Sequence, residues 1–150
     1  MTPASVVFVG GLIAAALDIV FACSYWALRR DVPVQRVLQS VAAGLRGPAS
    51  FSGGIATAAL GLLLHVLIAL GMAYAYYFAA KAWPALWHQP WLGGLGYGLL
   101  LYAVMTFVVV PLSAAAPSST RDPLWTALSV AAHVLLVGWP IAFAARRALA

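Results

Sequence analysis

Charged residues are scarce in this chain of 150 residues. Asp, Glu, Lys and Arg make up only 7% of the residues, whereas 65% are hydrophobic and the mean hydropathy is +0.99. A soluble domain of this length cannot bury so much apolar surface, because too large a share of its residues must face the solvent. The composition therefore predicts an integral membrane protein with one transmembrane domain, residues 1–150.

Cysteine and sequence motifs of known enzymes are also lacking. Cys23 is the single cysteine, which excludes an intramolecular disulfide and a metal cluster built on cysteine. The chain contains no HExxH, Walker or GxGxxG motif and no Ser-His-Asp spacing, so we expect neither a conventional hydrolase nor a nucleotide-dependent enzyme. Lys and Arg number 8 against 3 for Asp and Glu. These few basic residues lie at the ends of apolar segments, which argues against binding of nucleic acid.

Four apolar segments are long enough to cross a bilayer, at residues 5–28, 51–80, 91–112 and 124–145. A helix satisfies its own backbone hydrogen bonds in lipid, so each segment should be helical. We expect the first to be a true span and not a cleaved signal, because no basic region precedes its long apolar run. The predicted fold is an all-α, integral-membrane four-helix bundle.

A fifth helix is predicted between the first two spans, over residues 33–46. Apolar residues recur there at helical spacing, while polar residues occupy much of the other side. Asp31 is the candidate N-cap of this helix, and Pro33 suits its first turn. The pattern indicates an amphipathic helix in the membrane interface. A solvated connector is the alternative.

The basic residues predict the orientation of the chain. With both termini outside, five basic residues lie on the inner side and three on the outer side, as the positive-inside rule requires. The outer residues are Lys81, Arg146 and Arg147. The inner residues are Arg121 and four that we assign to the membrane interface: Arg29, Arg30, Arg36 and Arg46. The prediction is that both termini are periplasmic.

Four ionisable residues lie near the middle of the apolar segments: Asp18, His65, Tyr102 and His133. At a rise of about 1.5 Å per residue, each lies roughly 14–18 Å from one end of its span, near the middle of a hydrocarbon layer about 30 Å thick. A polar group at that depth costs several kcal/mol unless it has a partner. We therefore expect one shared polar site at mid-membrane depth, with Asp18 contacting His65 first.

Small residues predict which way these polar side chains face. Small residues that recur every four positions lie on the same helix face as Asp18, His65 and Tyr102, and a shorter series lies on the face of His133. Such faces are typical of close helix packing. The predicted packing residues are Gly10, Ala14, Gly53, Thr57, Gly61, Gly94 and Gly98. In the last span, Gly138 and Pro140 predict a kink and are candidate hinge residues.

The polar site is compatible with several functions. A carboxylate beside imidazoles can relay protons and couple them to transport of a solute or ion. Asp18, His65 and His133 could instead bind Zn²⁺ or another transition ion, and two histidines could hold a haem, so a redox module is a further alternative. A purely structural role, in which the polar layer sets helix packing in a scaffold subunit, needs no cofactor. Four short spans make a narrow monomer, so we expect a homo-oligomer or a subunit of a membrane complex, surrounded by lipid.

Several blocks of sequence carry a resemblance. They are RVLQSVAAGLRG (36–47), GGIATAALGLLLH (53–65), GYGLLLYAVMTFVVVPLS (96–113) and AAHVLLVGWPIA (131–142). The chain resembles a group of short bacterial inner-membrane proteins and, more distantly, the YagU-like family, which has similar "FPL…P" and "GH" blocks in its later helices. The resemblance implies a location in the bacterial inner membrane and assigns no catalytic residue.

Overall fold

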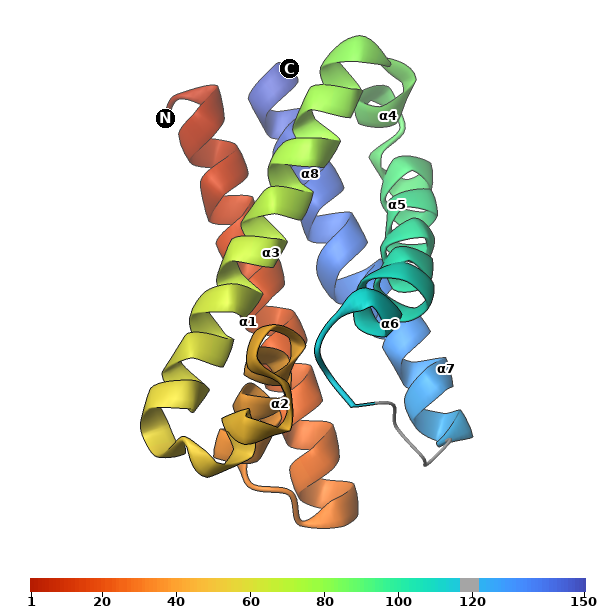
Figure 1. Cartoon of the computed structure of the whole chain (residues 1–150). Coiled ribbons are helices and arrows are strands. Elements are labelled where there is room, and N and C mark those ends of the chain that lie inside the picture. The colour runs from red at the N-terminus through yellow and green to blue at the C-terminus, as the bar shows by residue number, and fades with distance from the viewer. Residues whose placement is uncertain (117–121) are drawn as a thin grey trace.

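The computed structural model describes residues 1–116 and 122–150, and within these residues the fold is all-helical (Figure 1). Arg121, counted above among the inner basic residues, lies outside the described residues. Four long helical segments are apolar and long enough to cross a membrane: Pro3–Arg30, Gly54–Ala82, Pro90–Leu112 and Pro123–Leu149. The prediction of an all-α chain with four long apolar helices is confirmed.

The first two long segments are the uninterrupted helices α1 (Pro3–Arg30) and α3 (Gly54–Ala82). The third comprises α5 (Pro90–Val104), a π-helical stretch η2 (Met105–Val109) and α6 (Val110–Leu112). The fourth comprises α7 (Pro123–Ala132), a π-helical stretch η3 (His133–Gly138) and α8 (Trp139–Leu149). Three shorter elements connect them: α2 (Val34–Arg46), the 3₁₀ helix η1 (Gly47–Ser52) and α4 (Ala85–His88).

The boundary between α1 and α2 differs from the prediction. Asp31 does not cap α2. It closes α1 in the left-handed conformation, with φ of 50° and its N–H donated to the carbonyl of Ala27 at 3.2 Å. Aspartate tolerates this conformation better than most residues, which suits it to a helix end. The N-cap of α2 is Pro33, which has extended backbone and no side chain able to form a capping hydrogen bond.

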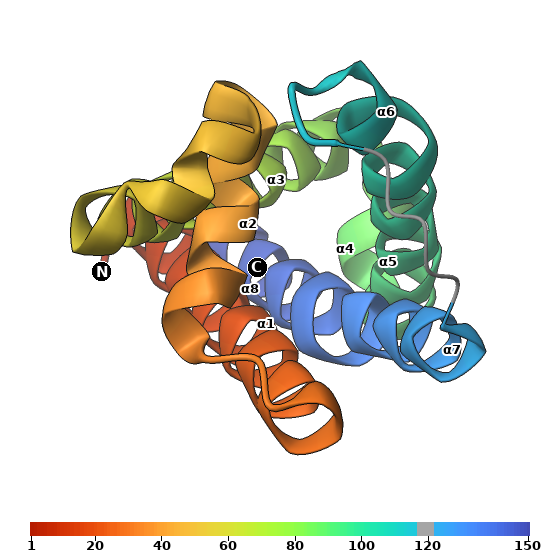
Figure 2. The same ribbon diagram turned by 60° about the horizontal axis from the view of Figure 1, so that its bottom comes forward.

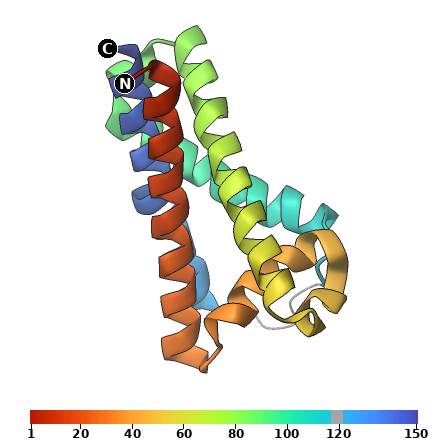
Figure 3. The same ribbon diagram turned by 90° about the vertical axis from the view of Figure 1, so that its left-hand side faces the viewer.

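Helices α1 and α3 cross near the middle of the molecule (Figure 1). Both termini lie at one end, and α2 lies between α1 and α3 at the opposite end (Figures 1 and 3). Figure 2 shows α2 crossing this end of the bundle. The buried core is built largely of small side chains, among them Ala14, Ala73, Ala80 and Ala142, which let helices approach closely.

Glycine residues create the closest crossings between helices. A Cβ atom at Gly98 of α5 would lie 2.6 Å from the carbonyl oxygen of His133 and from Cα of Val134. Gly138 packs in the same crossing, against the backbone of Gly94 and Gly98. These contacts place the third and fourth long segments backbone against backbone, as the predicted small-residue face of α5 requires.

The remaining predicted packing residues have different partners. Gly10 contacts Ala144 of α8, whereas Gly61 of α3 packs against the carbonyl of Leu38 in α2, which is not a long segment. Thr57 is buried beside the same connecting helix. Gly53 does not pack between helices: it is exposed, it precedes α3, and its nearest side-chain neighbour is Thr57 of that helix. The predicted span from residue 51 begins too early, because residues 47–52 form η1.

Each π-helical stretch comes just before a proline. The N–H of Val110 bonds to the carbonyl of Met105, and the N–H of Trp139 bonds to the carbonyl of Val134, so both bonds reach back five residues. Pro111 and Pro140 follow directly, and a proline can neither donate an N–H nor accommodate the carbonyl four residues earlier. Widening the preceding turn relieves that clash. The hinge role of Gly138 and Pro140 stays a prediction, but both lie at this irregular junction.

The glycine crossing predicts a position-specific effect of added methyl groups. Gly98→Ala should destabilise the fold by about 1–3 kcal/mol, because the new Cβ overlaps the backbone of η3. Gly96→Ala, two residues away on α5, has nothing within 4 Å of the new Cβ and should be neutral or slightly stabilising. Thermal and denaturant unfolding of both variants in detergent would check this. Equal effects of the two substitutions would contradict the crossing.

Candidate functional site

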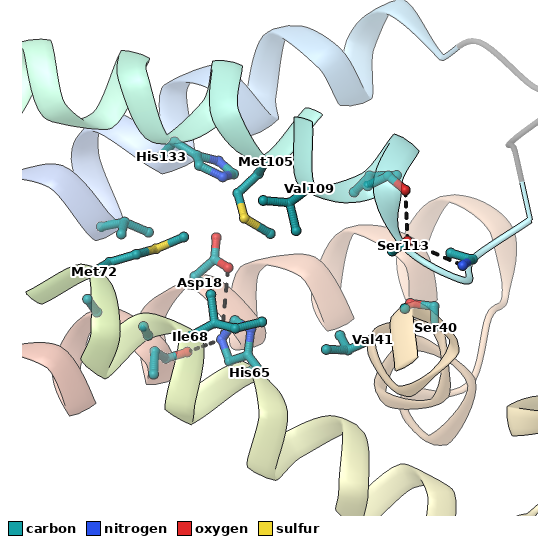
Figure 4. Close-up of a pocket in the computed structure, with 17 residues that line it drawn as sticks. Asp18, Ser40, Val41, His65, Ile68, Met72, Met105, Val109, Ser113 and His133 are labelled. Carbon is teal, nitrogen blue, oxygen red and sulfur yellow. Dashed lines mark hydrogen bonds and ion pairs between the residues drawn. The ribbon is translucent and has the colours of Figure 1, made fainter. Parts of the chain in front are cut away.

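A partly open cavity of about 300 Å³ lies among the helices, and all four long segments and α2 contribute to its wall. Most of the wall is apolar. Its ionisable or hydrogen-bonding side chains are Asp18, Ser40, His65, Ser113 and His133, and its two sulfur atoms belong to Met72 and Met105. Figure 4 shows these side chains entering the cavity from different helices. Three of the four polar residues that the sequence indicated thus line a single cavity.

Asp18 of α1 and His65 of α3 face each other across the wall of the cavity. Oδ2 of Asp18 lies 3.9 Å from Nε2 of His65 (Figure 4), and their side chains are 25% and 15% exposed. Nε2 of His65 is also 3.0 Å from the carbonyl oxygen of Ala15. A carbonyl only accepts, so Nε2 carries the proton in this contact and Nδ1 retains the lone pair of the neutral ring. The imidazole therefore links α3 to α1 while one ring nitrogen stays free.

His133 lies at the start of η3, and its imidazole is also held by a backbone carbonyl. Its Nδ1 is 2.8 Å from the carbonyl oxygen of Ser129, four residues earlier, and therefore donates to it. Nε2 is then the nitrogen that can accept a proton or bind an ion. The side chain is directed toward the space near Asp18 and Met105 in Figure 4.

Tyr102 lies outside the cavity. Its ring makes an edge-to-face contact with the imidazole of His133, with ring centres 5.5 Å apart, and it lines a second, wider groove that also contains Trp26 and Asp122. The reason is the packing of α5: Gly94 and Gly98, on the same face as Tyr102, press against η3. That face therefore meets the fourth long segment and not the centre of the bundle.

A buried polar network joins α2 to α3, and sequence reasoning missed most of it. Gln39 is only 3% exposed, although it lies among the polar residues of α2. Its Nε2 donates to the carbonyl of Gly54 at 2.9 Å and to Oγ1 of Thr57 at 3.2 Å, and Thr57 donates to the carbonyl of Ser50 at 2.7 Å. The network holds α2 against α3, so Ser40 and Val41 of α2 form one wall of the cavity. No periodic signal in the sequence distinguishes Gln39 from its exposed neighbours.

Metal binding by carboxylate and imidazole alone finds no support. Among residues 1–116 and 122–150, no three His, Cys, Asp or Glu side chains lie close enough together to hold a metal ion. The described residues therefore do not bring Asp18, His65 and His133, the ligand set that the sequence suggested, together as a three-residue site.

A second polar cluster joins the ends of α1 and α7. Asp122 caps α7 by accepting the N–H of Trp125 at 3.1 Å, and its Oδ2 accepts from the hydroxyl of Tyr25 at 2.9 Å and lies 3.6 Å from Nη2 of Arg30. Trp125 also stacks on Phe21, with ring centres 5.8 Å apart. The N–H of Trp125 first, and then the Tyr25 hydroxyl and the Arg30 guanidinium, hold the pKa of Asp122 below its ordinary value, although partial burial opposes them.

The other basic residues assigned to the interface lie at the same end of the bundle. Arg36 stacks on Phe51, with its guanidinium carbon 4.6 Å from the ring centre, and it lines the wider groove. Arg29 and Arg46 are exposed at the ends of α1 and α2. A shared position at one end fits a common set of contacts with lipid headgroups or water.

The lowered pKa of Asp122 predicts acid-dependent stability. The ionised carboxylate stabilises the fold at neutral pH, and this contribution should be lost as the pH falls below the ordinary carboxyl pKa of about 3.9 toward the lower folded value. The difference in melting temperature between the wild type and Asp122→Asn should therefore shrink as the pH falls from about 5 to about 2.5. Tyr25→Phe removes one of the bonds and should show a smaller change of the same sign. A difference between wild type and Asp122→Asn that is independent of pH would contradict the assignment.

Comparison of the chain with protein-family models, with curated proteins and with solved structures finds no match.

Proposed function

We propose that the protein is a multi-pass protein of the bacterial inner membrane that couples protons to the movement of a small solute or ion through the cavity. The observation that carries the proposal is the contact of Asp18 with His65 at 3.9 Å, on the wall of an otherwise largely apolar cavity. Ionisable residues inside membrane segments are costly and tend to mark ion or proton pathways.

The outer surface of the bundle supports the membrane setting. Large apolar side chains are exposed along every long segment, for example Val20 (63%), Leu63 (55%), Phe107 (71%) and Leu135 (47%). In water such a surface would drive aggregation, whereas in a bilayer it faces lipid. Trp83 and Trp91 at the terminal end, and Trp26 and Trp125 at the other, suit two aromatic belts. In this arrangement α2 lies at the inner interface.

The proposed proton step uses the free nitrogen of His65. When Nδ1 takes up a proton, the ring becomes a cation beside the Asp18 carboxylate, and the resulting ion pair strengthens the link between α1 and α3. Loss of that proton weakens the link. Because the two helices already diverge next to this point, the protonation state can change how widely the cavity opens. Since four short spans make a narrow monomer, a homo-oligomer or a larger membrane complex would complete the pathway.

A structural role is the second candidate, and a specific contact favours it. The hydrogen bond from His65 to the carbonyl of Ala15 joins α1 to α3 in any protonation state of Asp18. Such interhelical bonds contribute about 0.6–2 kcal/mol in membranes and can fix helix register without moving protons. The two functions differ in whether the carboxylate of Asp18 is needed for proton movement.

A measurement of proton movement across vesicle membranes distinguishes the proton-coupled function from the structural role. Vesicles containing the purified protein and a trapped pH dye should show proton uptake under an applied potential, and Asp18→Asn should reduce the rate by about tenfold or more, since the neutral amide cannot form an ion pair with the protonated ring of His65. Asp31→Asn makes the same chemical change at an exposed helix end and should leave the rate unchanged. If Asp18→Asn conducts like the wild type and only melts at a different temperature, the structural role is correct.

The proposed orientation can be tested independently. A C-terminal alkaline phosphatase fusion, which is active only in the periplasm, should be active, whereas a fluorescent-protein fusion at the same end should be dark. Removing inner positive charges with Arg36→Gln and Arg46→Gln should lower the proportion of correctly oriented chains, because the predicted excess of inner charge is small. A phosphatase fusion that is inactive at the C-terminus would reverse the assignment.

A further inference from the structure

The cavity collects four of the seven methionine, cysteine and histidine side chains of the chain. The sequence has three methionines and three histidines, and apart from Met1 both methionines line this cavity, together with two of the histidines. Met72, Met105, His133 and Asp18 enter it from α3, η2, η3 and α1 and are directed toward a common space (Figure 4). Met72 also packs against the buried core, and a thioether side chain is both a flexible filler and a soft metal ligand.

His133 is held in the way that metal-binding histidines usually are. Its Nδ1 donates to the carbonyl of Ser129 at 2.8 Å, which fixes the ring and leaves Nε2 as the electron-pair donor. Histidine ligands almost always donate their other ring N–H to a carboxylate, a backbone carbonyl or water, which orients the ring and makes it a better donor. The hydrogen bond to Ser129 thus both stabilises the helix and leaves Nε2 of His133 available to bind a metal ion.

Met105 and His133 occupy equivalent positions in their helices. Each is the first residue of a π-helical stretch, η2 and η3 respectively, and each stretch precedes a proline. A π turn shifts the direction of side chains relative to a regular α-helix, and such turns are frequent at functional sites. Both helices become irregular where they face the cavity. This shared irregularity indicates a site formed by Met105 and His133.

The donor types and the charge indicate which ion fits. Thioether sulfur is a soft ligand that selects Cu(I) and similar soft ions over Zn²⁺, Na⁺ or Mg²⁺. Methionine and neutral histidine carry no charge, so the single carboxylate of Asp18 balances one positive charge and no more. A divalent ion would leave an uncompensated charge in a largely apolar cavity, which is costly.

We propose that Sδ of Met72, Sδ of Met105 and Nε2 of His133 bind a monovalent soft cation, Cu(I) or its redox-inert analogue Ag(I), with Asp18 balancing its charge. This inference deepens the proposed function and rests on it, because it names the class of ion that the cavity would accept. Binding itself requires neither a proton gradient nor a vesicle, so it can be measured separately from transport.

The test measures Cu(I) binding to the purified full-length protein in detergent, without oxygen, by competition with a chromophoric Cu(I) chelator. We expect one ion per chain, displaced by Ag(I) but not by Zn²⁺ or Na⁺. Met72→Leu and Met105→Leu keep the side-chain volume and remove the sulfur, so each should weaken binding by about tenfold or more while the apo protein melts as before. His133→Ala should weaken binding similarly, and His88→Ala, outside the cavity, should not.

Three outcomes would overturn the inference: no binding of Cu(I) or Ag(I), binding that the leucine variants retain in full, or displacement by Zn²⁺. If Ag(I) does not bind but proton uptake still depends on Asp18, this inference fails and the proposed function stands. If Ag(I) binds through the two methionines and His133 while proton uptake is absent, the site is correct and the proposed coupling to protons fails.

Discussion

Close contact between helix backbones is the constraint on which the rest of this structure depends. In the proposed lipid environment, apolar side chains gain little by moving from lipid into the protein, so helices associate where small residues let their backbones touch. Gly98 meets the backbone of His133 and Val134, Gly61 meets Leu38, and the core is rich in alanine. Because few large side chains fill the interior, a cavity remains where α2 separates α1 from α3.

The apolar interior of the bundle explains how its polar groups are satisfied. His65 donates to the carbonyl of Ala15, His133 to that of Ser129, and Gln39 to that of Gly54. Backbone carbonyls are the acceptors that a helix always offers, since each has a second lone pair. A histidine held in this way keeps one ring nitrogen free, so a bond that fixes helix position also leaves a group ready for chemistry.

Irregular helices add the final element of the site. Pro111 and Pro140 each follow a π-helical stretch, and these stretches begin at Met105 and His133. The widened turns are a local response to proline, but their effect reaches the cavity, because they set the direction of two of its side chains. One region of the bundle therefore combines three features: helix packing at glycine, polar groups held by backbone carbonyls, and turns widened before proline.

The sequence alone determined the four long apolar helices, because run length and hydropathy are properties of each segment by itself. Depth and helix face also indicated that Asp18 and His65 should meet, and they lie 3.9 Å apart. Tertiary structure decided which neighbour each face meets. It packed Tyr102 against His133, buried Gln39, and placed Met72 and Met105 in the wall of one cavity. Helical periodicity gives the direction in which a side chain points around the axis of its helix. The partners of that side chain depend on how the helices cross and where α2 lies, and contacts between residues distant in sequence set both.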